Sequence, residues 1–166
     1  MSGHDTVPYQ PVFVGETLAK LEALYPKYPE KRALLLPALW LVQEARGWVP
    51  PEAMHEVAQQ LELTAAYVAG VATFYTMYHL HPVGRHFIQV CTTSPCGICG
   101  AEDVARELLV QTGCRDLGAT SPDGRFTVVE VECLGACGFA TPLLINDDFI
   151  ESVSVDTVAS VLARYP

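Results

Sequence analysis

Four cysteines divide into two close pairs, and the chain between the pairs is long enough for one helix and one strand. Cys91 and Cys96 form the first pair, and Cys133 and Cys137 form the second. Each pair begins where a predicted strand ends. If these two strands are parallel, the crossover between them returns the chain to the same edge of the sheet. Both cysteine pairs then lie together at that edge.

The second half of the chain reads as strands and helices in turn. Val129 and Val131 alternate with Glu130 and Glu132, a pattern typical of a strand with one buried face. The expected elements are a strand at Phe87–Val90, a helix at Ala101–Gln111, a strand at Phe126–Glu132, a hairpin of Leu143–Asn146 and Phe149–Val153 around Asp147-Asp148, and a helix at Asp156–Tyr165.

The first half reads as helices alone. Leu18, Leu21 and Leu24 recur at helical spacing. Further helices are expected at Lys31–Arg46 before Gly47, at Pro51–Leu61, and at Ala65–Tyr75 with Thr64 as N-cap. Four aromatic residues are expected in the core and on the contact surface of this bundle: Trp40, Tyr67, Phe74 and Tyr75. We therefore predict an α+β chain, with a helical bundle in residues 1–82 and a second domain in residues 83–166.

The composition argues against two kinds of partner. Met1–Tyr9 lacks the basic and apolar regions of a signal peptide, and the longest apolar stretch, Ala33–Val42, is about half the length that crosses a bilayer. The formal charge is −9, and residues 83–166 carry −6 of it, from eleven acidic and five basic side chains. No basic stripe is present to neutralise phosphates. We expect a soluble protein without a nucleic-acid partner, whose acidity serves a solvated surface or a docking face for a basic partner.

Glycines beside both cysteine pairs bear on what the thiolates hold. A [2Fe–2S] cluster takes four thiolates, two per iron, and needs backbone that can approach its sulfides. Such backbone is expected at Gly97, Gly100, Gly135 and Gly138. Structural zinc also takes four thiolates, but its pairs are usually about two to four residues apart, and the first pair is at the loose limit. The residues favour a [2Fe–2S] cluster over zinc.

Cys99 leaves two alternatives open. With Cys91 and Cys96 it reproduces the C-x4-C-x2-C spacing of plant-type ferredoxins, in which Cys99 is a ligand and one member of the second pair is not. Cys96 and Cys99 also form a C-x-x-C at a predicted helix start, the context of a thiol–disulfide oxidoreductase. That alternative leaves the other cysteines without a role. Cys114 is most simply a free thiol near a helix end.

Other site patterns are absent from the sequence. There is no G-x-G-x-x-G after a strand and no phosphate-binding P-loop, so we expect no nucleotide site on this chain. A Rieske centre replaces two cysteines by histidines, and no histidine pairing of that kind is present. Surface or core positions are expected for His4, His55, His79, His81 and His86. A cluster without a substrate pocket indicates an electron carrier that needs partners.

Several runs of residues carry a family resemblance over roughly residues 15–165. The most specific is V-E-C-L-G-A-C at residues 131–137. The others are Ile88–Cys91 with Pro95-Cys96, Gly100–Glu102, Ser121–Phe126, Ile145–Asp148, Leu34–Pro37, Gly47–Pro50 and Gly70–Tyr75. Together they resemble the thioredoxin-like [2Fe–2S] subunit of respiratory complex I, an NADH:quinone oxidoreductase. One departure is Cys99, where that family commonly has another residue.

The resemblance implies a thioredoxin-like [2Fe–2S] ferredoxin domain behind the helical bundle, with one cluster on Cys91, Cys96, Cys133 and Cys137. It implies that NADH reduces FMN on a partner subunit and that the cluster exchanges single electrons with this flavin. The expected partners are that flavin- and NADH-binding subunit and other peripheral-arm subunits, with the bundle as docking module. The expected location is the cytoplasm, peripheral to the inner membrane and without direct insertion.

Related assemblies use similar subunits, namely NAD-dependent formate dehydrogenases and NAD-linked hydrogenases. The segment Cys133–Asp148 looks more like the complex I version. A free-standing ferredoxin of this fold would not need a helical half ahead of the cluster domain. The sequence therefore favours an NADH dehydrogenase subunit.

Overall fold

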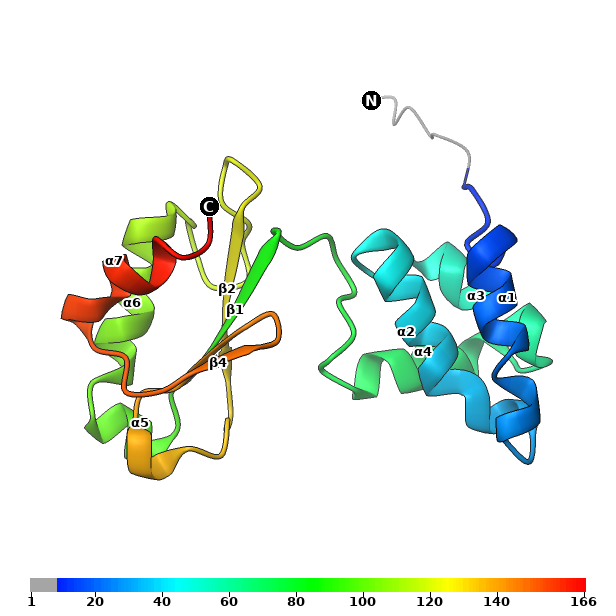
Figure 1. The fold of residues 1–166 in the computed structure, drawn as a ribbon, viewed down its shortest axis with the longest axis horizontal. Helices are drawn as coiled ribbons and strands as arrows, with labels where there is room; N and C mark the ends of the chain where they lie inside the picture. The colour runs from blue at the N-terminus through cyan, green and yellow to red at the C-terminus, as the bar shows by residue number, and fades with distance from the viewer. Residues whose placement is uncertain (1–8) are drawn as a thin grey trace. The chain divides into compact units, whose positions relative to one another are not determined.

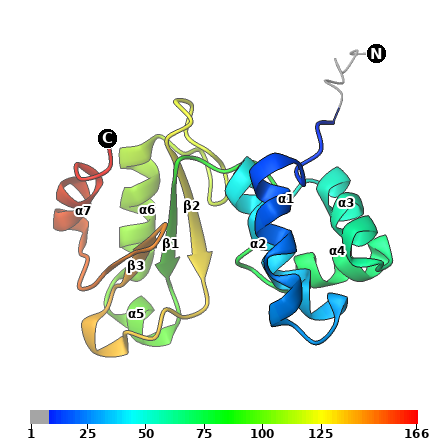
Figure 2. The same cartoon turned by 45° about the vertical axis from the view of Figure 1, so that its right-hand side comes forward.

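The structure of the chain is a computed structural model that describes residues 9–166, and it consists of two compact units divided after Pro82 (Figure 1). The first unit is helical, and the second combines a sheet with helices, which confirms the α+β class (Figures 1 and 2). Residues 1–8 lie outside the described residues; they include His4 and most of the N-terminal segment in which no signal peptide is expected. Within residues 9–166, no helix has both the length and the apolar character needed to span a membrane.

Local sequence signals set the ends of the helices in the first unit. The Thr64 hydroxyl accepts a hydrogen bond from the Tyr67 N–H at 3.2 Å and so caps a helix start. Gly47 ends another helix with a φ of 79°, which glycine adopts without strain. The helices are α1 (Gly15–Glu22), α2 (Leu35–Arg46), α3 (Pro51–Leu61) and α4 (Ala65–Phe74), with 3₁₀ turns at Tyr25–Lys27 and Lys31–Leu34.

Two findings refine the expectations for this unit. The helix expected from Lys31 begins at Leu35, because Pro37 lacks an N–H and fits only in the first turn of an α-helix. The four aromatic residues expected in the core and on a contact surface all lie at the surface, with exposed fractions of 42%, 46%, 76% and 40% for Trp40, Tyr67, Phe74 and Tyr75.

A carboxylate on α3 fixes the segment that leads into α1. Glu56 accepts hydrogen bonds from the N–H groups of Val12 at 2.9 Å and Phe13 at 2.8 Å, and from the Tyr9 hydroxyl at 2.6 Å. Burial and the hydrogen bond to Glu56 raise the pKa of Tyr9 above its ordinary value, so the phenol stays a donor. These contacts place Val12 and Phe13 in the core of the helical unit.

The second unit is built on a four-stranded sheet in the order β2-β1-β3-β4. The first two strands are parallel, as expected, and the other neighbours are antiparallel. Two helices, α6 and α7, pack with the sheet in one core that contains Ile88, Val90 and Val128 (Figure 2). The elements are β1 (His86–Cys91), α5 (Ser94–Ile98), α6 (Ala101–Thr112), β2 (Phe126–Val131), a 3₁₀ turn (Cys137–Phe139), β3 (Leu143–Ile145), β4 (Asp148–Ile150) and α7 (Val155–Leu162).

The hairpin turn lies one residue earlier than expected, because Asp148 already begins β4. Asn146 takes the turn position with a φ of 53°, which asparagine tolerates better than most residues. Its side chain accepts the Phe87 N–H at 2.9 Å and donates to the Arg85 carbonyl at 3.2 Å. The contacts of the Asn146 side chain with Arg85 and Phe87, at the start of β1, add to this local preference and fix the position of the turn.

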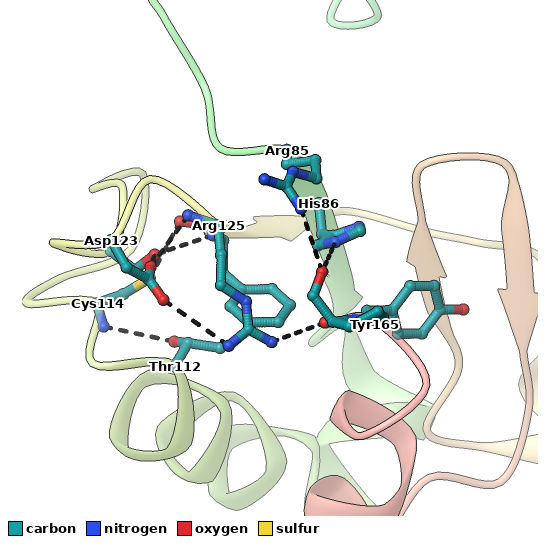
Figure 3. A network of polar contacts seen from close by, with 10 residues as sticks. Arg85, His86, Thr112, Cys114, Asp123, Arg125 and Tyr165 are labelled. Carbon is teal, nitrogen blue, oxygen red and sulfur yellow. Dashed lines mark hydrogen bonds and ion pairs between the residues drawn. The ribbon is translucent and has the colours of Figure 1, made fainter.

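A polar network holds the last residues of the chain against the end of the sheet where β1 begins (Figure 3). The Arg125 guanidinium donates to the Tyr165 carbonyl at 2.8 Å. Arg85 and His86 contact the carbonyl oxygen of Pro166 at 3.3 Å and 3.4 Å. This network is at the opposite end of β1 from Cys91, so it stabilises the unit without contributing to the cysteine site.

Gly84 approaches the backbone of β2 so closely that a side chain has no room. A Cβ there would lie 2.6 Å from the carbonyl carbon of Phe126, and the Gly84 N–H donates to the Thr127 hydroxyl at 2.7 Å. We predict that Gly84→Ala lowers the free energy of unfolding by about 1–3 kcal/mol, measured by denaturant titration. The matched control is Gly70→Ala in α4, where no atom lies within 4 Å; this change should be neutral or stabilise by up to about 1 kcal/mol. Equal stability of the two variants would contradict this packing account.

Candidate iron–sulfur site

The loops that carry the two cysteine pairs leave neighbouring parallel strands at the same edge. Cys91, the last residue of β1, lies beside Val131, the last residue of β2. The Thr93 hydroxyl donates to the carbonyl of Glu132, and the Cys91 thiol donates to the same oxygen with an Sγ–O distance of 3.7 Å. Because Cys133 follows Glu132, these contacts bring the start of the second pair to the first.

Cys91 and Cys96 form the buried half of the site. Their side chains are 4% and 2% exposed. Ala101 of α6 is fully buried with them, and Leu134 and Ala140 pack against the group. These small and apolar neighbours keep water away from the two sulfurs.

Hydrogen bonding separates the acidities of these two thiols. Burial raises the pKa of Cys91, but the hydrogen bond with Cys96 and those from the backbone of Thr93 and Leu134 outweigh it, so the pKa lies below its ordinary value. Burial, with the hydrogen bond to Cys91, raises the pKa of Cys96 to about 11. Cys91 is therefore the more acidic of the two thiols, and a bound metal ion would deprotonate both.

Cys133 and Cys137 form the exposed half of the site. The Gly135 N–H donates to the Cys133 sulfur at 3.3 Å, in a turn that gives Gly135 a φ of 76°. Cys137 is close enough to Cys96 for its charge to raise the pKa of that thiol. At least one residue of the exposed pair, Cys137, is therefore close to a residue of the buried pair, Cys96.

The two remaining cysteines differ in their relation to this site. Cys99 is exposed, and its charge also raises the pKa of Cys96. Cys114 is buried in the core between sheet and helices, and its thiol donates to the Phe126 carbonyl at 3.5 Å. Since Phe126 begins β2, Cys114 lies at the end of the strand opposite to the cysteine pairs.

The donor set fits a [2Fe–2S] cluster. The two loops offer four thiol sulfurs, and backbone N–H groups of Thr93, Leu134 and Gly135 point at two of them. Hydrogen bonds of this kind stabilise cluster sulfurs and tune the reduction potential. Among residues 9–166, no three cysteine, histidine, aspartate or glutamate side chains already converge as ligands of a single metal ion.

Some contributors to the site carry no sequence signal. The Glu132 carbonyl and the N–H groups of Thr93 and Leu134 are backbone atoms, whose direction only the folded loop determines. The sequence predicts that Gly97 allows close approach of the backbone near the first pair. The structure shows a steric reason why a glycine suits this position. A Cβ at Gly97 would lie 3.3 Å from the Thr92 carbonyl oxygen, so a glycine lets α5 pack against the loop.

The geometry also bears on the alternatives that involve Cys99. A thiol–disulfide enzyme needs an accessible thiol with a lowered pKa. Cys96 is buried and its pKa is raised, and α5 has only five residues. The pair therefore lacks the features of a thioredoxin-type redox site. Cys99 is exposed and follows Cys96 by three residues, so it lies near the cysteine site.

Comparison with known proteins gives consistent results. The family model of the thioredoxin-like [2Fe-2S] ferredoxin matches residues 21–166. The chain is 39% identical over 155 residues to an NADH-quinone oxidoreductase subunit of Rickettsia bellii, covering 92% of each chain. It is 45% identical over 138 residues to the corresponding NADH-quinone oxidoreductase subunit of Pseudomonas aeruginosa, covering 83% of this chain and 82% of that one.

A solved structure shares the fold. An NAD+-reducing [NiFe]-hydrogenase in its H2-reduced state matches 80% of this chain with a TM-score of 0.68 and 21% sequence identity. The match spans 22% of the hydrogenase chain. At this identity the likeness extends to the fold alone.

Single cysteine substitutions should distinguish the proposed ligands from the neighbouring Cys99. We predict that Cys91→Ser and Cys133→Ser each lose or severely destabilise the cluster, because a hydroxyl is a poor substitute for a thiolate ligand. Iron and acid-labile sulfide per chain, with the visible spectrum, measure the loss. The control, Cys99→Ser, should keep the final spectrum unchanged. A normal cluster in both ligand variants would refute the ligand set, and loss of the cluster in Cys99→Ser would favour the plant-type set instead.

Proposed function

The chain belongs to the thioredoxin-like [2Fe–2S] ferredoxin family, and from this premise we propose that it is the electron-transfer subunit of an NADH-quinone oxidoreductase. One [2Fe–2S] cluster is held by Cys91, Cys96, Cys133 and Cys137. The observation that carries this proposal is the meeting of both cysteine loops at the ends of two parallel strands. The identity of 39% and 45% to the two bacterial oxidoreductase subunits, over more than four fifths of each chain, supports the same assignment.

The residues of the chain divide the work at the proposed site. A [2Fe–2S] cluster supplies a centre that accepts and returns one electron at a time. Cys91 and Cys96 hold it on a side from which water is excluded, since both thiols are nearly fully buried. The N–H groups of Thr93, Leu134 and Gly135 stabilise negative charge on the sulfurs, which favours the reduced state and raises the potential.

The exposed half of the site is where electrons enter and leave. Cys133 and Cys137 are exposed, and Phe139 beside them is 58% exposed. We propose that the flavin-bearing partner covers this side and that the cluster exchanges single electrons with its FMN. NADH also binds that partner, because this chain carries no nucleotide-binding motif of its own.

The helical unit is proposed as the docking module. A largely apolar groove of about 500 Å³ is lined by residues of α2, of the segment before α2 and of the segment after α4, among them Trp40, Met77 and Tyr78. Phe74 nearby in the chain is 76% exposed, and the side chains of Trp40 and Met77 are 42% and 44% exposed. Aromatic residues and methionine are enriched at protein interfaces. This surface is therefore suited to other peripheral-arm subunits of the same complex.

A second assignment has one observation in its favour. The fold match to an NAD+-reducing hydrogenase means that the corresponding part of an NAD-linked hydrogenase, or of an NAD-dependent formate dehydrogenase, would have the same architecture. The relatives named as parts of quinone oxidoreductases match at higher identity and over nearly their whole length, so that assignment is preferred. With the quinone oxidoreductase assignment we propose a cytoplasmic location, peripheral to the inner membrane, as part of a membrane-bound complex.

The division of labour between subunits can be tested with NADH. We predict that the purified chain, loaded with its cluster, shows no NADH oxidation with an artificial electron acceptor, because it has no nucleotide site. After addition of the flavin-bearing partner, NADH should reduce the cluster and give the electron paramagnetic resonance signal of a reduced [2Fe–2S] centre. NADH turnover by the chain alone, or a cluster that NADH plus partner leaves oxidised, would overturn the proposed role.

A further inference from the structure

One buried hydroxyl in the second unit has no hydrogen-bond partner. Among residues 9–166, four buried side-chain polar atoms make no hydrogen bond, and three of them are nitrogens of Arg46, His86 and Arg125, whose side chains bond through another nitrogen. The fourth is Oγ1 of Thr141, the one polar atom of its side chain. Thr141 is fully buried. Because an unsatisfied buried hydroxyl is costly, this group calls for an explanation.

The backbone around Thr141 is fixed by hydrogen bonds. The Thr141 carbonyl accepts the Val153 N–H at 2.9 Å, and the Phe139 carbonyl accepts the Ser152 N–H at 2.9 Å. These two bonds join the segment before β3 to the segment after β4. A β-branched side chain on a fixed backbone has few rotamers, so the hydroxyl has little freedom to find a more distant acceptor.

Thr141 lies at the end of the sheet that carries the cysteines. It is two residues before Leu143 of β3, which pairs with the residue of β1 just before Cys91. Its neighbour in the chain, Ala140, packs against the buried group that contains Cys91 and Cys96. The unpartnered hydroxyl is therefore beside the buried half of the proposed cluster site.

We propose that the Thr141 hydroxyl donates a hydrogen bond to a sulfur of the [2Fe–2S] cluster on its buried side. The inference rests on the proposed cluster site and adds a residue that tunes its reduction potential. Cluster sulfurs accept hydrogen bonds, and within residues 9–166 no protein atom serves this hydroxyl as acceptor. A donor at this place stabilises the reduced cluster more than the oxidised one, because the reduced cluster carries more negative charge. The hydroxyl therefore raises the potential.

Three substitutions of Thr141 separate the effect of the hydroxyl from that of side-chain size. Thr141→Ser keeps the hydroxyl in a smaller side chain, Thr141→Val keeps the shape without the hydroxyl, and Thr141→Ala removes both. The midpoint potential of the cluster-loaded, full-length chain is measured by redox titration with electron paramagnetic resonance as the readout. We expect Thr141→Val and Thr141→Ala to lower the equilibrium constant of one-electron reduction about threefold to tenfold, a fall of roughly 28–59 mV. Thr141→Ser should keep the potential of the unmodified chain.

The matched control is Thr127→Val in β2. Thr127 is also buried, but its hydroxyl accepts the Gly84 N–H at 2.7 Å, at the end of β2 opposite to the cysteines. This variant should lose stability, because the Gly84 N–H is left without its acceptor, and its midpoint potential should not change.

A potential that follows side-chain size would overturn the inference, with Thr141→Val close to the unmodified chain and Thr141→Ala close to Thr141→Ser. Equal potentials in all of these chains would overturn it as well. In both cases the cluster itself is present, so the proposed function stands. A chain that binds no [2Fe–2S] cluster would overturn the proposed function together with the inference, and iron and sulfide analysis identifies that failure.

Discussion

The parallel pairing of β1 with β2 is the constraint on which the cysteine site depends. It aligns Cys91 with Val131, so both strands deliver their cysteine loops to one edge. A strand of six residues is about 20 Å long at roughly 3.3 Å per residue, so an antiparallel pairing would separate the two loops by about that distance. The buried residues Ile88, Val90 and Val128 hold the pairing in place from the side that faces the helices.

The asymmetry of the site follows from where the two loops lie. The loop after β1 turns inward through α5 and buries Cys96, whereas the loop after β2 stays at the surface with Cys133 and Cys137. Burial disfavours charge on Cys96, and bound iron would offset that cost by stabilising its thiolate. An electron carrier needs a buried side that holds its cluster away from water and an exposed side from which electrons pass to a partner. The buried pair and the exposed pair of cysteines match these two requirements.

Periodicity predicted that residues 126–132 form a strand, but it did not predict which residues of that strand are buried. Phe126, Thr127 and Val128 are all buried, whereas Val129 and Val131 are only half-buried. Helix ends at Gly47 and Thr64 were predictable, since their signals are local. The turn at Asn146 was misplaced by one residue, because contacts with β1 decide it. The Thr93–Glu132 contact was not predictable, because it joins backbone and side-chain groups that meet only in the folded chain. The ligand set itself came from family resemblance, and it stays a prediction.

Low-temperature electron paramagnetic resonance of the purified chain, with iron and sulfide quantified, tests the central claim most directly. The account predicts an oxidised sample without a signal, and, after one-electron reduction by dithionite, a [2Fe–2S] signal that integrates to one spin per chain. Silence in both states, in a chain fully loaded with the metal it binds, would contradict the electron-carrier account and assign the four cysteines to a structural metal such as zinc.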